Sequence, residues 1–239
     1  MVRHGSTSWP VTAVILAAGA GRRMGSDVPK QYLPIGGAPL LAWTATAFDR
    51  SAVVDEIVLV VPKHDLQFVA DAIVAAFHVR KVRRIVAGGS TRQESMEAGL
   101  AAVKGEGVVL VHDGVRPFVS EGIIAAAAEC AAMSGAALVA VPITDTVKRV
   151  NDRGEVVETI PRERLWAAQT PQAFRVSLLR RAVERAKAEG YAATDEAVLV
   201  ERLGVSIPVV PGEPDNVKIT TPEDHRRAEE ICKRKDPPC

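Results

Sequence analysis

The sequence predicts an α/β protein with a doubly wound, mostly parallel sheet of the Rossmann-like kind and a protruding β-hairpin arm. Short apolar runs recur along the chain, and segments of helical spacing separate them. Parallel strands covered on both faces are continuous apolar runs, and the step from one to the next requires a crossover helix. A pair of alternating segments around a turn predicts the arm.

The apolar runs are the predicted strands of the sheet. They occupy residues 12–18, 56–61, 82–86, 108–112 and 137–141. The predicted crossover helices occupy residues 65–77, 92–103 and 122–133. Doubly wound sheets bind ligands at the carboxyl ends of their strands. The loops after Ala18, Val86 and His112 are therefore expected to share one crevice.

Residues 144–160 break this alternation and predict the arm. The segments TDTVKRV and EVVETI alternate polar and apolar residues, and Asn151-Asp152-Arg153-Gly154 between them favours a tight turn. A two-stranded arm is marginal in water by itself, so it needs a surface to pack on. That surface belongs either to its own domain or to a second subunit.

Beyond the arm, the pattern predicts helices around residues 176–190 and 195–203 and strands near 207–210 and 217–219. A last helix is expected to begin at Thr221, a capping residue followed by Pro222 and two acids. We expect residues 1–10 to be a flexible leader, 11–234 to be one domain that includes the arm, and 235–239 to be a flexible tail.

Composition and charge exclude several functional classes. The 239 residues are 47% hydrophobic, which is enough for a substantial core. Lys and Arg number 30 against 29 Asp and Glu, so no overall field gathers nucleic acid or an anionic membrane. No apolar stretch approaches the roughly 20 residues of a membrane span. The three cysteines lack the spacing of a zinc site or a disulfide framework, which favours the cytoplasm.

A glycine-rich loop follows the first predicted strand and carries the strongest signal for a site. It comprises Ala17, Ala18, Gly19, Ala20 and Gly21, with two arginines and then Lys30 downstream. Glycines let backbone N–H groups approach phosphate oxygens, and the cations suit a triphosphate. The alternative is a surface turn with solvated charges.

Two familiar phosphate motifs do not fit this loop. A dinucleotide fingerprint requires glycine where Met24 stands, and the chain contains no Gly-Lys-Ser/Thr triplet of a P-loop. The sequence thus disfavours a nicotinamide oxidoreductase and a P-loop kinase.

Two further loops follow later strands. Gly89 and Ser95 lie in a loop that opens a helix, where they can read the edge of a planar base, and a cap at Ser90 or Thr91 is compatible with that role. Asp113 ends the fourth predicted strand and is a candidate magnesium ligand or base. Its alternative role is an ion pair with Arg116 that braces the turn. His112 is expected to pack in the core.

Motifs across the chain together resemble the 2-C-methyl-D-erythritol 4-phosphate cytidylyltransferase family of non-mevalonate isoprenoid biosynthesis. The matching segments are LAAGAGRRM, PKQY, HDGVRP, QTPQ, TDEA and DNVKIT, in order, from about residue 13 to residue 230. The resemblance implies a nucleotidyltransferase that binds CTP and magnesium at the glycine-rich loop. It also implies a homodimer in which the arm at 144–160 embraces the partner subunit.

The resemblance also assigns roles to residues of this chain. It implies that Arg23 and Lys30 act in the transition state and that Lys218 helps to hold the triphosphate and the substrate. Residues 17–21, Gly89, Ser95 and Asp113 are implied to bind CTP. The implied sugar-phosphate contacts are Asp113, Arg116 and Lys218, with Thr146 and Arg162 from the partner's arm. Magnesium is expected mainly on the CTP phosphates, with Asp113 as a possible ligand.

The nearest alternative is a sister cytidylyltransferase that acts on ribitol 5-phosphate, because it shares the nucleotide loop. A more distant alternative is a binding or regulatory subunit that has lost catalysis. Loss of Arg23 or Lys30 would favour that alternative, and both residues are present.

Overall fold

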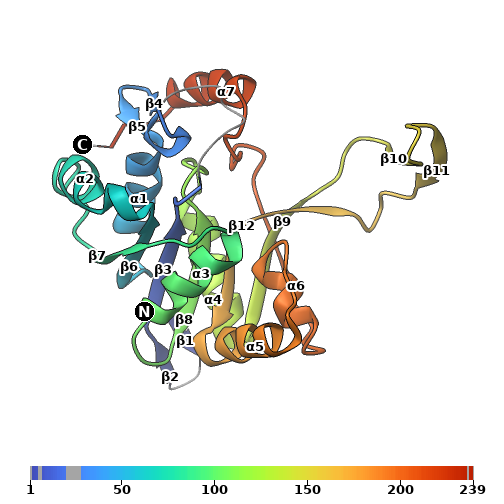
Figure 1. The fold of residues 1–239 in the computed structure, drawn as a ribbon, viewed down its shortest axis with the longest axis horizontal. Coiled ribbons are helices and arrows are strands. Elements are labelled where there is room, and N and C mark those ends of the chain that lie inside the picture. Colours follow the sequence, from blue (N-terminus) through green and yellow to red (C-terminus); the bar gives the residue numbers. More distant parts are fainter. Residues whose placement is uncertain (1, 5–6, 20–27, 236, 239) are drawn as a thin grey trace.

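The computed structural model describes residues 2–4, 7–19, 28–235 and 237–238. In this part of the chain, a seven-stranded sheet has the order β13-β9-β12-β8-β3-β6-β7 (Figure 1). Its predicted strands are β3 (Val11–Leu16), β6 (Glu56–Val61), β7 (Val82–Ala87), β8 (Val108–Asp113) and β9 (Ala136–Pro142). The β3 strand pairs in parallel with both β6 and β8. The doubly wound, mostly parallel sheet is confirmed.

The sequence pattern did not reveal strand β12 (Trp166–Arg175), which lies between β8 and β9 and is antiparallel to both. Proline within a run normally argues against an interior strand, and Pro171 stands in the middle of this one. The pairing with β9 is irregular between Ala168 and Gln172, so the proline falls at a break in the ladder. The strand brings the QTPQ motif into the centre of the sheet.

Helices cover both faces of the sheet. Successive side chains of a strand point to opposite faces, so an apolar strand needs a packed layer on each side. On β3, Val14 joins the cluster beneath α3 (Arg92–Ala102) and α5 (Val176–Glu189). Ala13 and Ile15 point the other way, into the cluster beneath α1 (Leu40–Arg50) and α4 (Glu121–Ser134). Both faces of the sheet are therefore buried, which explains the continuous apolar runs.

Helix α1 was not predicted; it is buried on more than one side, and every position from Leu40 to Thr46 is buried. Leu41, Ala45 and Phe48 belong to the sheet cluster, whereas Leu40 and Trp43 pack in a separate cluster with α7 (Pro222–Cys232). The predicted start of α7 is confirmed, since the Thr221 side chain accepts a hydrogen bond from the Asp224 backbone N–H.

Two predicted elements differ in the structure. Residues 65–77 do not form one regular helix: they begin with a 3-10 turn, η3 (Lys63–Asp65), continue as α2 (Leu66–Val69) and end as a π-helix, η4 (Ala70–Ala75). The predicted strand at 217–219 is wrong, because that segment forms no strand and joins no sheet. Near 207–210 the strand is β13 (Val209–Pro211), and the helix at 195–203 is α6 (Glu196–Glu201).

Residues expected to form a frayed leader instead include a short hairpin of β1 (Val2–His4) and β2 (Thr7–Trp9). Val2 is buried in the sheet cluster, and the Arg175 guanidinium lies 4.9 Å from the ring centroid of Trp9. These contacts attach the described part of the leader to the domain.

The predicted arm is confirmed as β10 (Val147–Val150) paired antiparallel with β11 (Val156–Ile160). The turn is held by the Asn151 side chain, which accepts hydrogen bonds from the N–H groups of Arg153 and Glu155. In Figure 1 the arm extends away from the sheet and its helices. It does not pack back on its own domain.

Candidate functional site

The loops after three parallel strands form one pocket, as predicted from their position. The pocket has a volume of about 390 Å³ and lies at the carboxyl ends of β3, β7 and β8. Its walls consist of Leu16, Ala17, Ala18, Gly19, Lys30, Gln31, Gly89, Ser90, Thr91, Arg92, Ser95, Asp113, Val115 and Lys218. These residues come from five separate sequence motifs, so the fold rather than any one motif assembles the site.

The glycine-rich loop lines one wall through Ala17, Ala18 and Gly19. The Ala17 N–H donates to the Val60 carbonyl at 2.7 Å, which continues the strand pairing to the edge of the pocket. The predicted site residues Ala20, Gly21 and Arg23 lie outside the described residues.

Lys30 reaches the same pocket from a short 3-10 turn, η2 (Lys30–Tyr32). The turn is anchored by Tyr32, whose hydroxyl donates a 2.8 Å hydrogen bond to Asp65 and whose ring packs edge-on against Phe68. Burial, followed by the Asp65 carboxylate, raises the Tyr32 pKa, so the hydroxyl remains a donor. Lys30 therefore projects from a braced turn.

The loop before α3 is tightly packed against the glycine-rich loop. Thr91 and Glu94 form a capping box, and the Ser95 hydroxyl accepts from Gly89 N–H at 3.2 Å and donates to the Thr91 carbonyl at 2.9 Å. A Cβ atom at Gly88 would lie 2.4 Å from the Cβ of Ala18. Glycine is required there because the two loops touch, and the capping and pocket-lining roles coincide as expected.

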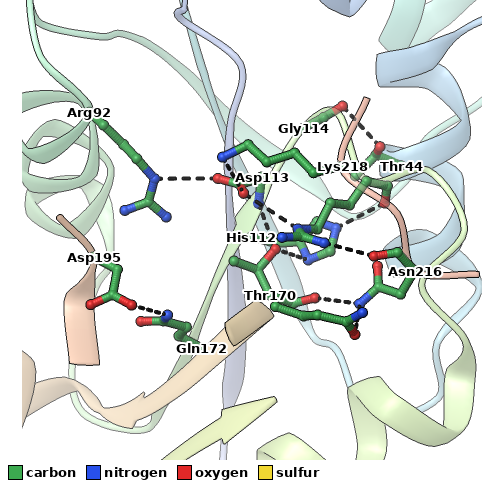
Figure 2. Close-up of polar contacts among 12 residues, drawn as sticks. Thr44, Arg92, His112, Asp113, Gly114, Thr170, Gln172, Asp195, Asn216 and Lys218 are labelled. Carbon is green, nitrogen blue, oxygen red and sulfur yellow. Dashed lines mark hydrogen bonds and ion pairs between the residues drawn. The ribbon is translucent and has the colours of Figure 1, made fainter. Parts of the chain in front are cut away.

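Asp113, at the end of β8, is surrounded by three cations (Figure 2). Its Oδ2 lies 2.9 Å from Lys218 Nζ and 3.5 Å from Arg116 Nε, and its Oδ1 lies 3.3 Å from Arg92 Nε. Burial alone would raise the Asp113 pKa, but Arg92, Lys218 and Arg116 outweigh it and hold that pKa well below its usual range. The carboxylate therefore stays ionised and holds Lys218 at the pocket.

His112 is buried beneath Asp113, as expected for a core residue. Its Nε2 lies 3.0 Å from the Arg116 carbonyl, which only accepts, so Nε2 carries the proton. Its Nδ1 then accepts from the Thr170 hydroxyl at 3.0 Å, and that hydroxyl accepts from the Asp113 N–H at 3.1 Å. Burial lowers the His112 pKa to about 4, so the ring is neutral at physiological pH.

The His112 contacts predict a pH dependence of stability. The folded pKa of about 4 lies below the ordinary value of 6.5, so the unfolded chain binds the extra proton between these values. We expect the free energy of unfolding to fall as pH drops through this window, by up to about 1.4 kcal/mol per pH unit. Urea unfolding at pH 7, 6, 5 and 4 measures the slope. His112→Gln, which keeps a donor for the Arg116 carbonyl, should flatten the slope, and an unchanged slope would contradict the assignment.

Lys218 reaches Asp113 because the segment before it is pinned by Asn216. The buried Asn216 amide donates to the Thr170 carbonyl at 2.9 Å and to Gln169 Oε1 at 3.1 Å, and its own carbonyl accepts from Arg116 Nη1 at 2.7 Å. The Ile219 N–H donates to the Val115 carbonyl at 2.9 Å. Three motifs, QTPQ, HDGVRP and DNVKIT, thus form one hydrogen-bonded unit.

The predicted site residues do not all meet in this pocket. Arg116 is largely buried behind Asp113 and is absent from the pocket walls, and burial lowers its pKa. Thr146 and Arg162 are exposed at the base of the arm and also do not line the pocket. The Arg162 guanidinium instead donates to the Thr144 carbonyl. Within one described chain, the arm residues and the pocket are separate.

Sequence reasoning missed Arg92 and Glu196 as members of the site. Arg92 Nη1 and Nη2 donate to the two Glu196 oxygens at 2.6 and 3.0 Å (Arg92 is labelled in Figure 2). The two residues are separated by 104 positions, so no local pattern could pair them. The available signals were that Arg92 follows the Gly88-Gly89 pair in the loop before α3 and that Glu196 lies in TDEA, one of the segments that carry the family resemblance.

The described residues offer little for a metal by themselves. No three His, Cys, Asp or Glu side chains among them gather as a metal site. Asp113 is the one carboxylate in the pocket walls as described, and its oxygens already face cations. Magnesium usually combines one or two carboxylates with water and substrate phosphates. The donor set therefore fits a magnesium ion held mainly by nucleotide phosphates.

A larger hollow, of about 570 Å³, lies between α1 and the residues after α7. Its charged members Arg50, Lys233, Arg234 and Lys235 are exposed surface side chains. None of the predicted site residues lines it, so we assign the site to the smaller pocket. In the part of the chain that the structure describes, no helix is long and apolar enough to cross a bilayer.

Known proteins resemble this chain over nearly its whole length. The family model of 2-C-methyl-D-erythritol 4-phosphate cytidylyltransferase matches residues 11–234. The proteins of that name from Geobacter metallireducens and Syntrophus aciditrophicus are 50% and 46% identical to it, each over 95% of this chain and 99% and 97% of their own. The crystal structure of 4-diphosphocytidyl-2C-methyl-D-erythritol synthase from Anaerococcus prevotii is 34% identical, has a TM-score of 0.83 and covers 95% of this chain and 97% of its own.

Proposed function

Because this chain belongs to the 2-C-methyl-D-erythritol 4-phosphate cytidylyltransferase family, we propose that its pocket transfers CMP from CTP to 2-C-methyl-D-erythritol 4-phosphate. The products are 4-diphosphocytidyl-2-C-methyl-D-erythritol and pyrophosphate, in the non-mevalonate isoprenoid pathway. The observation that carries this assignment to a site is the pocket in which Lys30, Lys218 and Asp113 meet beside the glycine-rich loop.

The reaction requires cations because two anions must approach each other. A phosphate oxygen of the substrate attacks the α-phosphorus of CTP in line with the departing pyrophosphate. Lys30 and Lys218, which both line the pocket, offset this repulsion, and Arg23 is assigned to the same task although it lies outside the described residues. The attacking phosphate is already ionised at neutral pH, so the residues need not remove a proton.

Lys218 has the right support for holding phosphate. Its ammonium lies 2.9 Å from Asp113, and its side chain is 37% exposed, so it can turn one donor to Asp113 and others to a ligand. Asp113 also forms ion pairs with Arg92 and Arg116. The cluster of two arginines and one lysine around this carboxylate carries a net positive charge. That excess charge suits a polyphosphate.

Recognition of cytosine is assigned to the loop before α3. Gly89 and Ser95 line the pocket, and the capping box of Thr91 and Glu94 fixes the backbone between them. A carbonyl acceptor that faces the exocyclic amine of cytosine would lose its partner against uracil, so this loop would select CTP over UTP. The sugar-alcohol phosphate would contact Asp113, Arg116 and Lys218.

Magnesium is proposed as the metal of the reaction, held by the CTP phosphates with Asp113 as its nearest protein carboxylate. When bound, it would neutralise phosphate charge and orient the triphosphate. The support for this proposal is the donor set described above, which leaves most of the ligands to the nucleotide and water.

A homodimer through the arm is proposed because the arm lacks a packing surface in the described chain. Val150, Val156 and Val157 are 53%, 62% and 56% exposed on it. An apolar two-stranded ribbon of this kind gains stability when it packs on another surface. In a dimer, Thr146 and Arg162 would reach the partner's pocket.

A cytoplasmic location is also proposed, since the described cysteines Cys130 and Cys232 are free thiols.

A pyrophosphate-release assay tests the activity. With Mg²⁺ and CTP we expect turnover of 2-C-methyl-D-erythritol 4-phosphate, and a kcat/KM for ribitol 5-phosphate that is lower by about 10²-fold or more, because a missing polar contact is costly. UTP in place of CTP is the control for base recognition. Preference for ribitol 5-phosphate would favour the sister activity, and no release with either substrate would contradict catalysis.

A further inference from the structure

An ion pair between Arg92 and Glu196 lies at the edge of the catalytic pocket. Glu196, the first residue of α6, is 1% exposed, and Arg92, the first residue of α3, lines the pocket. Arg92 donates to both carboxylate oxygens of Glu196, at 2.6 and 3.0 Å. This two-point contact orients the plane of the guanidinium, which a single hydrogen bond would not.

The oriented guanidinium turns its Nε–H toward Asp113. Arg92 Nε lies 3.3 Å from Asp113 Oδ1, which leaves Asp113 Oδ2 for Lys218 at 2.9 Å. The contacts therefore run from Glu196 through Arg92 and Asp113 to the ammonium of Lys218. Glu196 itself is absent from the pocket walls, so it acts on a ligand only through its neighbours.

Hydrogen bonds of the residues next to Glu196 fix its position at the start of α6. Asp195 caps α6 by accepting from the Val198 N–H at 3.1 Å, and it also accepts from Gln172 on β12 at 2.9 Å (Figure 2). The Gln172 side-chain oxygen accepts from the Ala197 N–H at 2.9 Å. Hydrogen bonds on both sides of Glu196 thus tie its backbone to the central sheet.

Without the Glu196 charge, the guanidinium of Arg92 would lose its strongest acceptor. Its two terminal nitrogens could then turn to the nearest remaining carboxylate, Asp113, and occupy both oxygens of that residue. Lys218 would lose its partner at Oδ2. The geometry around phosphate would be altered although neither Lys218 nor Asp113 had been changed.

We propose that Glu196 is a positioning residue for CMP transfer, which holds Arg92 so that Asp113 remains free to place Lys218 against the phosphates. The proposal rests on the function proposed above. A purely structural role, in which the pair only ties α6 to α3, predicts a loss of stability without a change in phosphate handling.

The test is Glu196→Gln, with kcat/KM measured by pyrophosphate release and CTP binding measured by calorimetry. We expect kcat/KM for CTP to fall about 10- to 100-fold, because small misplacements of a positioned group cost this much, and Kd for CTP to rise. The matched control is Glu97→Gln on α3, the helix that begins with Arg92, and it removes the 3.0 Å ion pair with Lys187 away from the pocket. That variant should retain wild-type kcat/KM and Kd.

A double variant tests whether Glu196 acts through Arg92. In the Arg92→Gln background, Glu196→Gln should cause no further loss, since the residue that it positions is gone. Thermal unfolding shows that each variant is folded at the assay temperature. Wild-type kcat/KM and Kd in Glu196→Gln, or losses that multiply in the double variant, would overturn the proposal. If the wild type binds CTP but releases no pyrophosphate, the proposed function fails, and calorimetry still decides the role of Glu196.

Discussion

Lys30→Ala is expected to lower kcat by about 10² to 10³-fold, because removal of one group that stabilises transition-state charge typically has this effect. Lys30 lies in the pocket wall at the start of η2. Its ammonium would meet negative charge that moves from the triphosphate to the departing pyrophosphate. KM for CTP should change less than kcat, because the contact strengthens as that charge develops.

The fold should survive this substitution. The turn is held by contacts other than the Lys30 ammonium, since Leu33 N–H donates to the Lys30 carbonyl and Tyr32 is anchored on Asp65. Lys63→Ala is the matched control, because Lys63 also begins a 3-10 turn but does not line the pocket. It should keep wild-type turnover. Near-normal kcat in Lys30→Ala, with pyrophosphate release followed under saturating substrates, would refute the role of this lysine.

Arg162→Ala is expected to lower kcat/KM for the sugar-alcohol phosphate about 10²-fold, since a charged contact to phosphate would be lost. KM for CTP should remain close to that of the wild type. The reason is that Arg162 lies on the arm, away from the pocket of its own chain, and would contact only the partner's substrate.

A mixing experiment separates a shared site from a site within one chain. Lys30→Ala and Arg162→Ala proteins are each nearly inactive, but a mixed dimer has one site with both residues intact. After subunit exchange, half of the dimers are mixed and each has one intact site of two, so about a quarter of wild-type activity should return. No recovery, together with a monomeric mass in sedimentation, would contradict the shared site. Arg149→Ala, which breaks an exposed ion pair with Glu158 on the arm, is a control for nonspecific arm effects.

The alternation of the chain was sufficient to predict most of the sheet. Strands such as Glu56–Val61 are continuous apolar runs because both faces of the sheet are covered. Such a run is visible in consecutive residues of the sequence. Helix α1 and strand β12 were not predictable in this way. The first is buried on several sides, and the second contains Pro171 at a break in its pairing.

The candidate site shows the same division between local and distant information. The sequence by itself determined that Gly19, Gly89 and Asp113 lie at or just after the carboxyl ends of parallel strands, because the fold class places those ends at one edge. Only the tertiary structure decided that Arg92 holds Glu196, that Asn216 pins the Lys218 segment, and that the arm leaves its own domain. Such contacts join residues that are far apart in the chain. Their energies depend on burial and on the distance between charges, and neither quantity exists until the chain has folded.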